Sequence, residues 1–205
     1  MNNLKKVLLI LLVITGAILY FKWDSIFPPP VSAIASTNYV GEKEIALIEI
    51  PKFYNQRDEK WKDIPLGKTN ESVGKVGCLI SSIGMNLSYM EMKMNPKVIN
   101  EKLTTIDGYT SRGWLIWSKL SEITEGKVSV EFPKLSHEKI EEYLLKGKPV
   151  LAKVLIHRVI PHWVLIVGKK DGEYLMLDPL TEGKPSNVSG YGNYLYSIRV
   201  LEKRS

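Results

Sequence analysis

The 205-residue sequence contains a single cysteine, Cys78, so the chain cannot form an intramolecular disulfide and its core alone must stabilise the fold. It contains only three histidines, His137, His157 and His162, and none has a metal-ligand spacing to a carboxylate. A metal site built on cysteines is excluded by the same scarcity. We therefore expect no metal and no cofactor.

The sequence also lacks a basic run, although its formal net charge is +6. Lys5, Lys6 and Lys22 against Asp24 give residues 1–35 a charge of +2, which leaves +4 spread along the rest of the chain. This pattern argues against a nucleic-acid partner and is compatible with anionic surroundings such as a cell wall. Hydrophobic residues make up 44% of the chain, which is enough for a core in one domain.

Charge is absent from Val7 to Phe21, directly after two lysines. As a helix this run would be about 22 Å long, and flanking Leu4, Trp23 and lysines can extend it towards the thickness of a bilayer. Residues 1–23 are therefore predicted to be a transmembrane anchor. The lysines ahead of the run favour an N-terminus inside the cell and the remaining chain outside.

A cleaved signal peptide is the alternative, because Ala33-Ile34-Ala35 before Ser36 has the form of a cleavage site and would release a secreted protein. Residues 24–45 are rich in Pro and Ser and are predicted to be a linker. The predicted domain is 46–205.

The patterns within this domain predict helices in its first half and an antiparallel sheet in its second, an α+β fold. We expect helices from Cys78 onward and over 96–103, 115–123 and 137–146. Strands are expected over 46–50, 127–132, 149–156, 162–170, 173–178 and 194–202, and a long loop over 51–77.

Cys78 follows Gly77 and opens a predicted helix with apolar residues at Leu79, Ile83 and Leu87. The unpaired N–H groups and the dipole of a helix N-terminus favour a thiolate, which is the reactive form of cysteine. A lone cysteine in an apolar helix is more often a core residue. A catalytic role therefore requires a nearby base.

His162 is the preferred base because it lies at the mouth of an apolar strand, whereas His157 is the weaker candidate and His137 is expected to be solvated. A hairpin that pairs Lys169 with Gly172 would bring His162 opposite Pro179 and next to Asp178. That carboxylate could orient the imidazole. The spacing thus predicts a Cys-His-Asp constellation.

The stretches "NQRDEKWKDIPLG", "GKVGCLISSIGMNLSY", "GWLIWSKL" and "PHWVLIVG…YLMLDP" occur in an order that resembles papain-like cysteine peptidases related to bacteriocin-processing double-glycine leader peptidases. The resemblance covers about residues 50 to 180. It implies a papain-like fold, with Cys78 as nucleophile, His162 as base, Asp178 as orienting carboxylate and Gln56 as oxyanion donor. The long spacing from Gln56 to Cys78 is more similar to the stand-alone branch than to transporter-fused members.

Together these features predict a membrane-anchored cysteine peptidase at the bacterial cell surface, a hydrolase that acts on peptides or proteins. A peptidoglycan amidase or endopeptidase with the same three residues is one alternative, so cell-wall peptides are a further expected partner. A catalytically inactive peptide-binding module of the same fold is the other.

Overall fold

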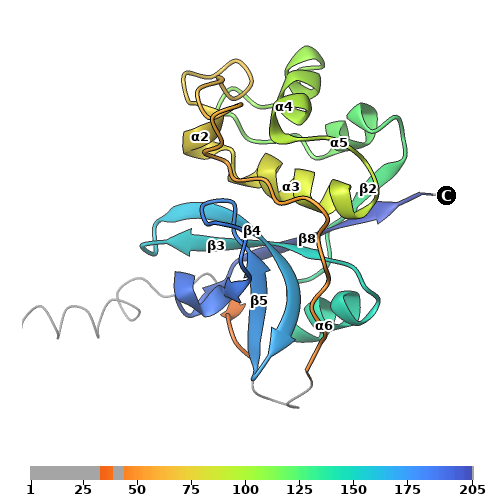
Figure 1. Cartoon of the computed structure of the whole chain (residues 1–205), viewed down its shortest axis with the longest axis vertical. Coiled ribbons are helices and arrows are strands. Elements are labelled where there is room, and N and C mark those ends of the chain that lie inside the picture. The colour runs from red at the N-terminus through yellow and green to blue at the C-terminus, as the bar shows by residue number, and fades with distance from the viewer. Residues whose placement is uncertain (1–32, 39–43, 205) are drawn as a thin grey trace, which may run out of the picture. The chain divides into compact units, whose positions relative to one another are not determined.

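Most helices precede most strands along the chain, which confirms the predicted α+β class (Figure 1). The computed structural model describes residues 33–38 and 44–204. The helices are α2 (Val73–Val76), α3 (Cys78–Tyr89), α4 (Pro96–Thr105), α5 (Ser118–Ile123), α6 (His137–Leu145) and the 3-10 helix η1 (Val188–Tyr191). The strands are β1 (Ile34–Ala35), β2 (Val128–Glu131), β3 (Val150–Ile156), β4 (Ile160–Lys170), β5 (Glu173–Leu177), β6 (Ser186–Asn187), β7 (Tyr194–Leu195) and β8 (Ser197–Lys203).

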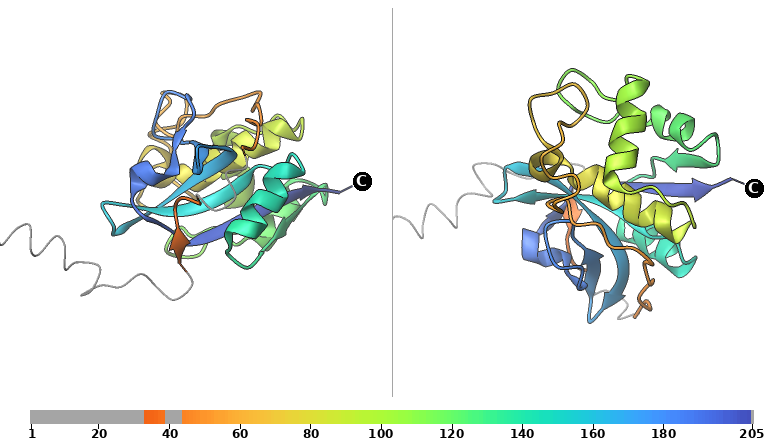
Figure 2. Two further views of the ribbon diagram at one scale, coloured as in Figure 1. Left: turned by 90° about the horizontal axis from the view of Figure 1, so that it is seen from below. Right: turned by 45° about the horizontal axis from the view of Figure 1, so that its top comes forward.

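Six strands form one antiparallel sheet in the order β2-β8-β3-β4-β5-β6. The two central strands, β3 and β4, alternate between the two faces of the sheet. Leu165 and Val167 pack with α3, α4 and α5, whereas Val164 and Ile166 pack with α6. The sheet is therefore covered on both faces, by α3–α5 on one and α6 on the other, as Figure 2 shows.

Helix α3 is the central helix, and ten of its twelve residues are buried. Small residues allow this close packing: a Cβ atom added at Gly84 would lie 3.1 Å from the carbonyl oxygen of Met94. Gly77, which separates α2 from α3, is even more restricted, because its Cβ would lie 2.4 Å from the carbonyl oxygen of Val73. Only glycine fits at this break, and the break makes Cys78 the first residue of α3.

Two helices begin at the polar residues that the sequence supplies as caps. The Asn95 side chain accepts a hydrogen bond from the N–H of Val98 at the start of α4, and Ser136 accepts one from Lys139 at the start of α6. These helices run over 96–105 and 137–145, within two residues of their predicted ends.

The strand predicted over 46–50 is wrong. Ile45 forms an isolated bridge with Lys169, and the Ile48 N–H donates to the carbonyl oxygen of Val167, but no continuous ladder forms. The physical reason is the irregularity of β4 between Ile166 and Gly168, which interrupts the regular spacing that a pairing strand would require.

Part of the predicted linker is folded onto the domain. Strand β1 pairs with β7, and the N–H of Ser36 donates to the carbonyl oxygen of Asn193 at 2.8 Å. Among residues 33–38 and 44–204, no helix is long and apolar enough to cross a membrane. The anchor predicted over 1–23 lies outside these residues and stays a prediction.

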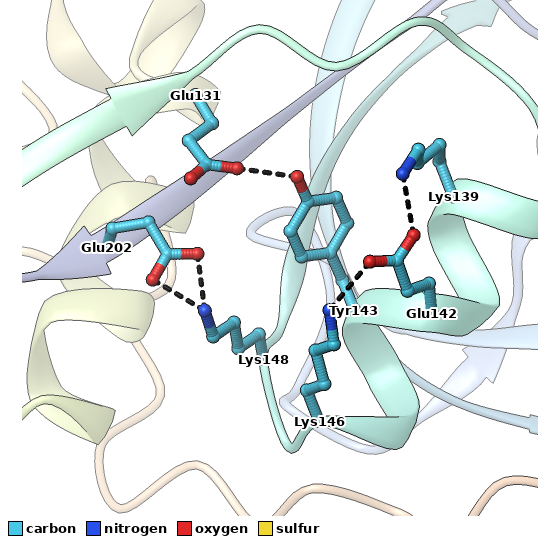
Figure 3. A network of polar contacts seen from close by, with 7 residues as sticks. All are labelled: Glu131, Lys139, Glu142, Tyr143, Lys146, Lys148 and Glu202. Atoms are coloured by element: carbon cyan, nitrogen blue, oxygen red, sulfur yellow. Dashed lines mark hydrogen bonds and ion pairs between the residues drawn. The ribbon is translucent and has the colours of Figure 1, made fainter.

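A network of polar side chains at the protein surface holds α6 close to β2 and β8 (Figure 3). Lys148 donates to both carboxylate oxygens of Glu202 at 2.6 Å, and the Tyr143 hydroxyl donates to Glu131 at 2.5 Å. The ion pairs of Glu142 with Lys139 and Lys146 in the same network are largely exposed, and such pairs contribute only about 0–1 kcal/mol each. Burial of the α6 apolar side is therefore the main force that holds this helix on the sheet.

Candidate active site

The Cys78 thiol is free and lies at the N-terminus of α3, where it is 9% exposed. It lies within hydrogen-bonding reach of His162 on the neighbouring strand β4. The sulfur thus lies between the N-terminus of a helix and an imidazole. The structure thus brings the predicted nucleophile and the preferred base together.

The break at Gly77 has a second consequence for Cys78. In an uninterrupted helix the Cys78 N–H would donate to the carbonyl oxygen of Gly74. Instead, the Gln56 side chain donates to that oxygen from Nε2 at 3.0 Å, and no backbone acceptor among the described residues takes the Cys78 N–H. This N–H is therefore available to an atom bound beside the sulfur.

His162 is 2% exposed and contacts Asp178, with 2.8 Å between His162 Nε2 and Asp178 Oδ1. Its other ring nitrogen, Nδ1, is then the atom available to Cys78. Burial lowers the pKa of His162, but the hydrogen bonds with Asp178 and Cys78 and the charges of these two groups outweigh burial and raise it to about 9. The imidazole is therefore protonated at neutral pH and can act as an acid towards a leaving group.

Asp178 directly follows β5 and is 1% exposed. Its Oδ1 also accepts a hydrogen bond from the N–H of Leu180 at 2.9 Å, and its Oδ2 accepts one from the hydroxyl of Tyr191. Burial raises the pKa of Asp178, but the hydrogen bonds from His162, Tyr191 and Leu180 outweigh it and keep that pKa below its usual value. Asp178 is therefore a carboxylate, and it can fix the orientation of the imidazole.

The hairpin that brings Asp178 to His162 has a different register from the predicted one. Lys170 pairs with Glu173 and closes a turn in which Asp171 and Gly172 both have positive φ, of 51° and 76°. The prediction paired Lys169 with Gly172, which is wrong, because a tight turn with two residues of positive φ leaves Gly172 inside the turn. The β-bulge between Ile166 and Gly168 then moves the register back by one residue, so that the pairs beyond it, such as Leu165 with Leu177, differ from the prediction by one position.

Gln56 is 2% exposed and is held between two parts of the site. Its backbone N–H donates to the carbonyl oxygen of Pro179, next to Asp178, and its side chain donates to Gly74, four residues before Cys78. An amide NH2 group has two hydrogens, so one remains for a further acceptor. The fold thus places Gln56 beside both halves of the predicted constellation.

The other two histidines lie apart from Cys78. His157 is exposed in the turn between β3 and β4, where its φ is 49°. His137, expected to be solvated, is half-buried: its Nδ1 lies 2.9 Å from the Tyr174 hydroxyl and the two rings stack. That expectation was wrong because Tyr174 on β5 covers the histidine at the start of α6.

Tyr191 was not predicted as a site residue. Besides its bond to Asp178, its ring lies 5.2 Å from that of His162 between centroids. It is the last residue of η1, in the stretch "SGYGNY", where no periodicity or motif marks a functional tyrosine. Only the return of this stretch to the end of β5 brings it to the site.

Within residues 33–38 and 44–204, no group of three His, Cys, Asp or Glu side chains could hold a metal ion. The polar groups around Cys78 are an imidazole, a buried carboxylate and N–H donors, beside a thiol at a helix N-terminus. Such a set can attack a carbonyl carbon, stabilise the resulting oxyanion and protonate the leaving group.

No protein-family model matches the chain, and no curated protein sequence is significantly similar to it. Nine chains of solved structures are similar. One is a crystal structure provisionally described as a C39-like peptidase from Bacillus anthracis, with 15% sequence identity and a TM-score of 0.48. The alignment covers 80% of this chain and 99% of that chain. At this identity and TM-score the similarity does not extend to function.

Proposed function

We propose that the chain is a cysteine peptidase of the papain-like class, in which Cys78 is the nucleophile, His162 the acid and base, and Asp178 the orienting carboxylate. The observation that carries this proposal is the continuous series of contacts from Cys78 through His162 to Asp178, buried at the start of α3 and the end of β5. Each residue alone has a structural explanation. Their arrangement in one series is typical of nucleophilic catalysis.

In the first step, the Cys78 thiolate forms a bond to the carbonyl carbon of the substrate, and the carbonyl oxygen becomes an oxyanion. The free N–H of Cys78 and the remaining N–H of Gln56 are the donors for that oxyanion. One donor of this kind is worth about 3 kcal/mol in a transition state. The carbon–nitrogen bond then breaks, and the amine leaves with the proton of His162.

In the second step, His162 takes a proton from water, whose oxygen attacks the thioester carbon. The carbon–sulfur bond breaks, which releases the acid and restores the Cys78 thiolate and the protonated imidazole. Asp178 keeps its charge in both steps and holds the ring.

The test is hydrolysis of a diverse peptide library by the purified full-length chain in detergent micelles, with new termini detected by mass spectrometry. His162→Asn should abolish cleavage, whereas His157→Asn is a matched control that changes an exposed histidine and should leave cleavage intact. Cleavage that persists in Cys78→Ala would contradict the proposal. Cleavage of cross-linked peptidoglycan alone, dependent on Cys78, would support the amidase alternative instead.

The papain-like class and the stand-alone branch of the leader-peptidase relatives belong to this proposal. A buried helix that starts at the cysteine and packs on an antiparallel sheet carrying the histidine supports the class. The long segment between Gln56 and Cys78 supports the branch. A cleavage profile without preference for a double glycine would speak against leader peptides as substrates.

We further propose that residues 1–23 anchor the chain, with the domain outside the cell. Cleavage after Ala35 would separate β1, which pairs with β7, from the domain and create an amino terminus at Ser36, which is 1% exposed. Burying an ammonium group is costly, and this supports an uncleaved chain. The measurement is the N-terminal sequence of protein from intact cells; a chain that begins at Ser36 would contradict the anchor.

A further inference from the structure

Asp178 has no free carboxylate oxygen. Oδ1 accepts from His162 and from the N–H of Leu180, and Oδ2 accepts from Tyr191. A buried carboxylate that loses one of these donors must leave an oxygen unpaired or take up a proton, and either change is costly. Tyr191 is the only side chain among the described residues that donates to Oδ2.

Tyr191 also contacts the imidazole itself. The rings of Tyr191 and His162 lie 5.2 Å apart with an angle of 54° between their planes. The Tyr191 side chain, which comes from η1, thus contacts both members of the His162–Asp178 pair. The ring limits rotation of the imidazole while the hydroxyl limits rotation of the carboxylate.

The segment that carries Tyr191 is held from several directions. Tyr191 is the last residue of η1, and the next residue, Gly192, has a φ of 107°, which a residue with a side chain rarely adopts. Two residues further on, β7 pairs with β1, and Asn193 accepts the N–H of Ser36. The tyrosine is therefore presented by a braced segment.

We propose that Tyr191 is a positioning residue: it holds the Asp178 carboxylate and the His162 imidazole in the arrangement in which they act on Cys78. This inference rests on the proposed function. Tyr191 does not take part in bond making, since it touches neither the sulfur nor the oxyanion donors in any described contact.

The surrounding charges keep the hydroxyl protonated, as a donor must be. Burial is the largest cause that raises the pKa of Tyr191 above its ordinary value of 10.0. The hydrogen bond to Asp178 and the negative charges of Asp178 and Cys78 raise it further. Arg57 is the facing cation and acts in the opposite direction. His162 completes the groups that face the ring.

The role of the Tyr191 hydroxyl as a donor to Asp178 determines in which direction its loss should shift the pH dependence of Cys78 reactivity. The Tyr191 hydroxyl lowers the pKa of Asp178. Without it, Asp178 takes up a proton at higher pH, the protonated His162 loses its partner, and Cys78 loses the cation beside it. The rate at which the thiol is alkylated falls as the pH is lowered, and we call this part of the pH profile the acid limb. Without the Tyr191 hydroxyl, the acid limb should lie at higher pH.

The experiment uses the full-length chain and the variant Tyr191→Phe, which keeps the ring and removes only the hydroxyl. Iodoacetamide alkylation across pH reports on Cys78 without a substrate and without interference, because the chain has no other cysteine. We expect the acid limb of alkylation to move up by about one pH unit, the effect of one hydrogen bond to a charge. We expect kcat for peptide hydrolysis to fall about tenfold with KM unchanged.

Tyr194→Phe is the matched control, since it removes a nearby hydroxyl for which the described residues provide no hydrogen-bond partner, and it should change neither readout. A second variant carries 3-fluorotyrosine at position 191. This more acidic phenol is a stronger donor and should move the acid limb down. It keeps the inference testable if Tyr191→Phe fails to fold.

The outcomes separate the two proposals. If no peptide is hydrolysed but the acid limb shifts as expected, the proposed function fails and the role of Tyr191 at the thiol stands. If peptides are hydrolysed and Tyr191→Phe matches the unmodified chain in acid limb and kcat, the role of Tyr191 is wrong. An unchanged acid limb with 3-fluorotyrosine would overturn it as well.

Discussion

Replacing Asp178 with Asn tests whether this carboxylate keeps His162 protonated. The pKa of His162 is raised from 6.5 to about 9, a difference of about 2.5 units. At 1.36 kcal/mol per unit, this corresponds to a preference of about 3 kcal/mol for the protonated ring. Asn has the same size as Asp but no charge, and an adjacent opposite charge shifts a pKa by about 1–3 units. We therefore expect the pKa of His162 to fall by at least about one unit in Asp178→Asn.

The assay is an NMR titration of the full-length chain in micelles, with histidine labelled at Cε1. The chain has only three histidines, so His162→Asn identifies the signal of interest by its loss. Asp171→Asn is the matched control: Asp171 is exposed in the turn between β4 and β5, and asparagine tolerates its positive φ. Its His162 titration should coincide with that of the unmodified chain.

A His162 signal in Asp178→Asn that titrates within a few tenths of a unit of the unmodified chain would refute this reasoning. It would mean that Asp178 is not the group that keeps His162 protonated. If the titration curve of His157 moved in Asp178→Asn as well, the substitution would have changed the whole domain. His157 lies in an exposed turn and has no contact with Asp178 in the described part of the chain.

Three further predictions follow from the site and its supports. Gln56→Ala should lower kcat by about 10² to 10³ if its remaining N–H binds the oxyanion, and an unchanged single-turnover rate would contradict that role. The raised pKa of His162 contributes stability that is fully present below pH 6.5 and is lost as the pH rises through about 9. The difference in free energy of unfolding between the unmodified chain and His162→Asn, measured in urea, should therefore shrink by about 3 kcal/mol over this range. A difference that does not vary with pH would contradict this prediction. Ser36→Pro removes the N–H that donates to Asn193 and should speed hydrogen exchange over 188–195, whereas Ser36→Ala, which keeps that N–H, should not.

Local patterns in the sequence determined α4 and α6 well, because a helix depends mainly on residues a few positions apart, whereas α5 begins three residues later than predicted and α2 lies within the segment predicted to be a loop. Asn95 and Ser136 each accept a hydrogen bond from an N–H three residues ahead, and the same residues marked the helix starts in the sequence. The position of Cys78 at the start of α3 was likewise predictable, since Gly77 ends the preceding turn and the apolar spacing begins after it.

The contact between His162 and Asp178 was predicted correctly from a register that was not. The hairpin turn displaced the pairing by two positions and the bulge moved it back by one, and the carboxylate lies just beyond the last ladder pair, Leu165 with Leu177, where its side chain can reach the imidazole. The sequence could place the two residues at the same end of two neighbouring strands. The exact ladder depended on φ values and strand irregularities that no pattern specifies.

Tyr191 and the folded segment 33–38 were decided by the tertiary structure alone. Tyr191 reaches Asp178 because η1 and β7 return the chain to the end of β5, and β1 supports that return from more than 150 residues earlier in the sequence. Contacts between such distant segments arise from packing of the whole sheet, and a single sequence carries no periodicity for them. The sequence by itself thus determined the α+β class and the residues available for catalysis, while the packing determined which side chains hold them in place.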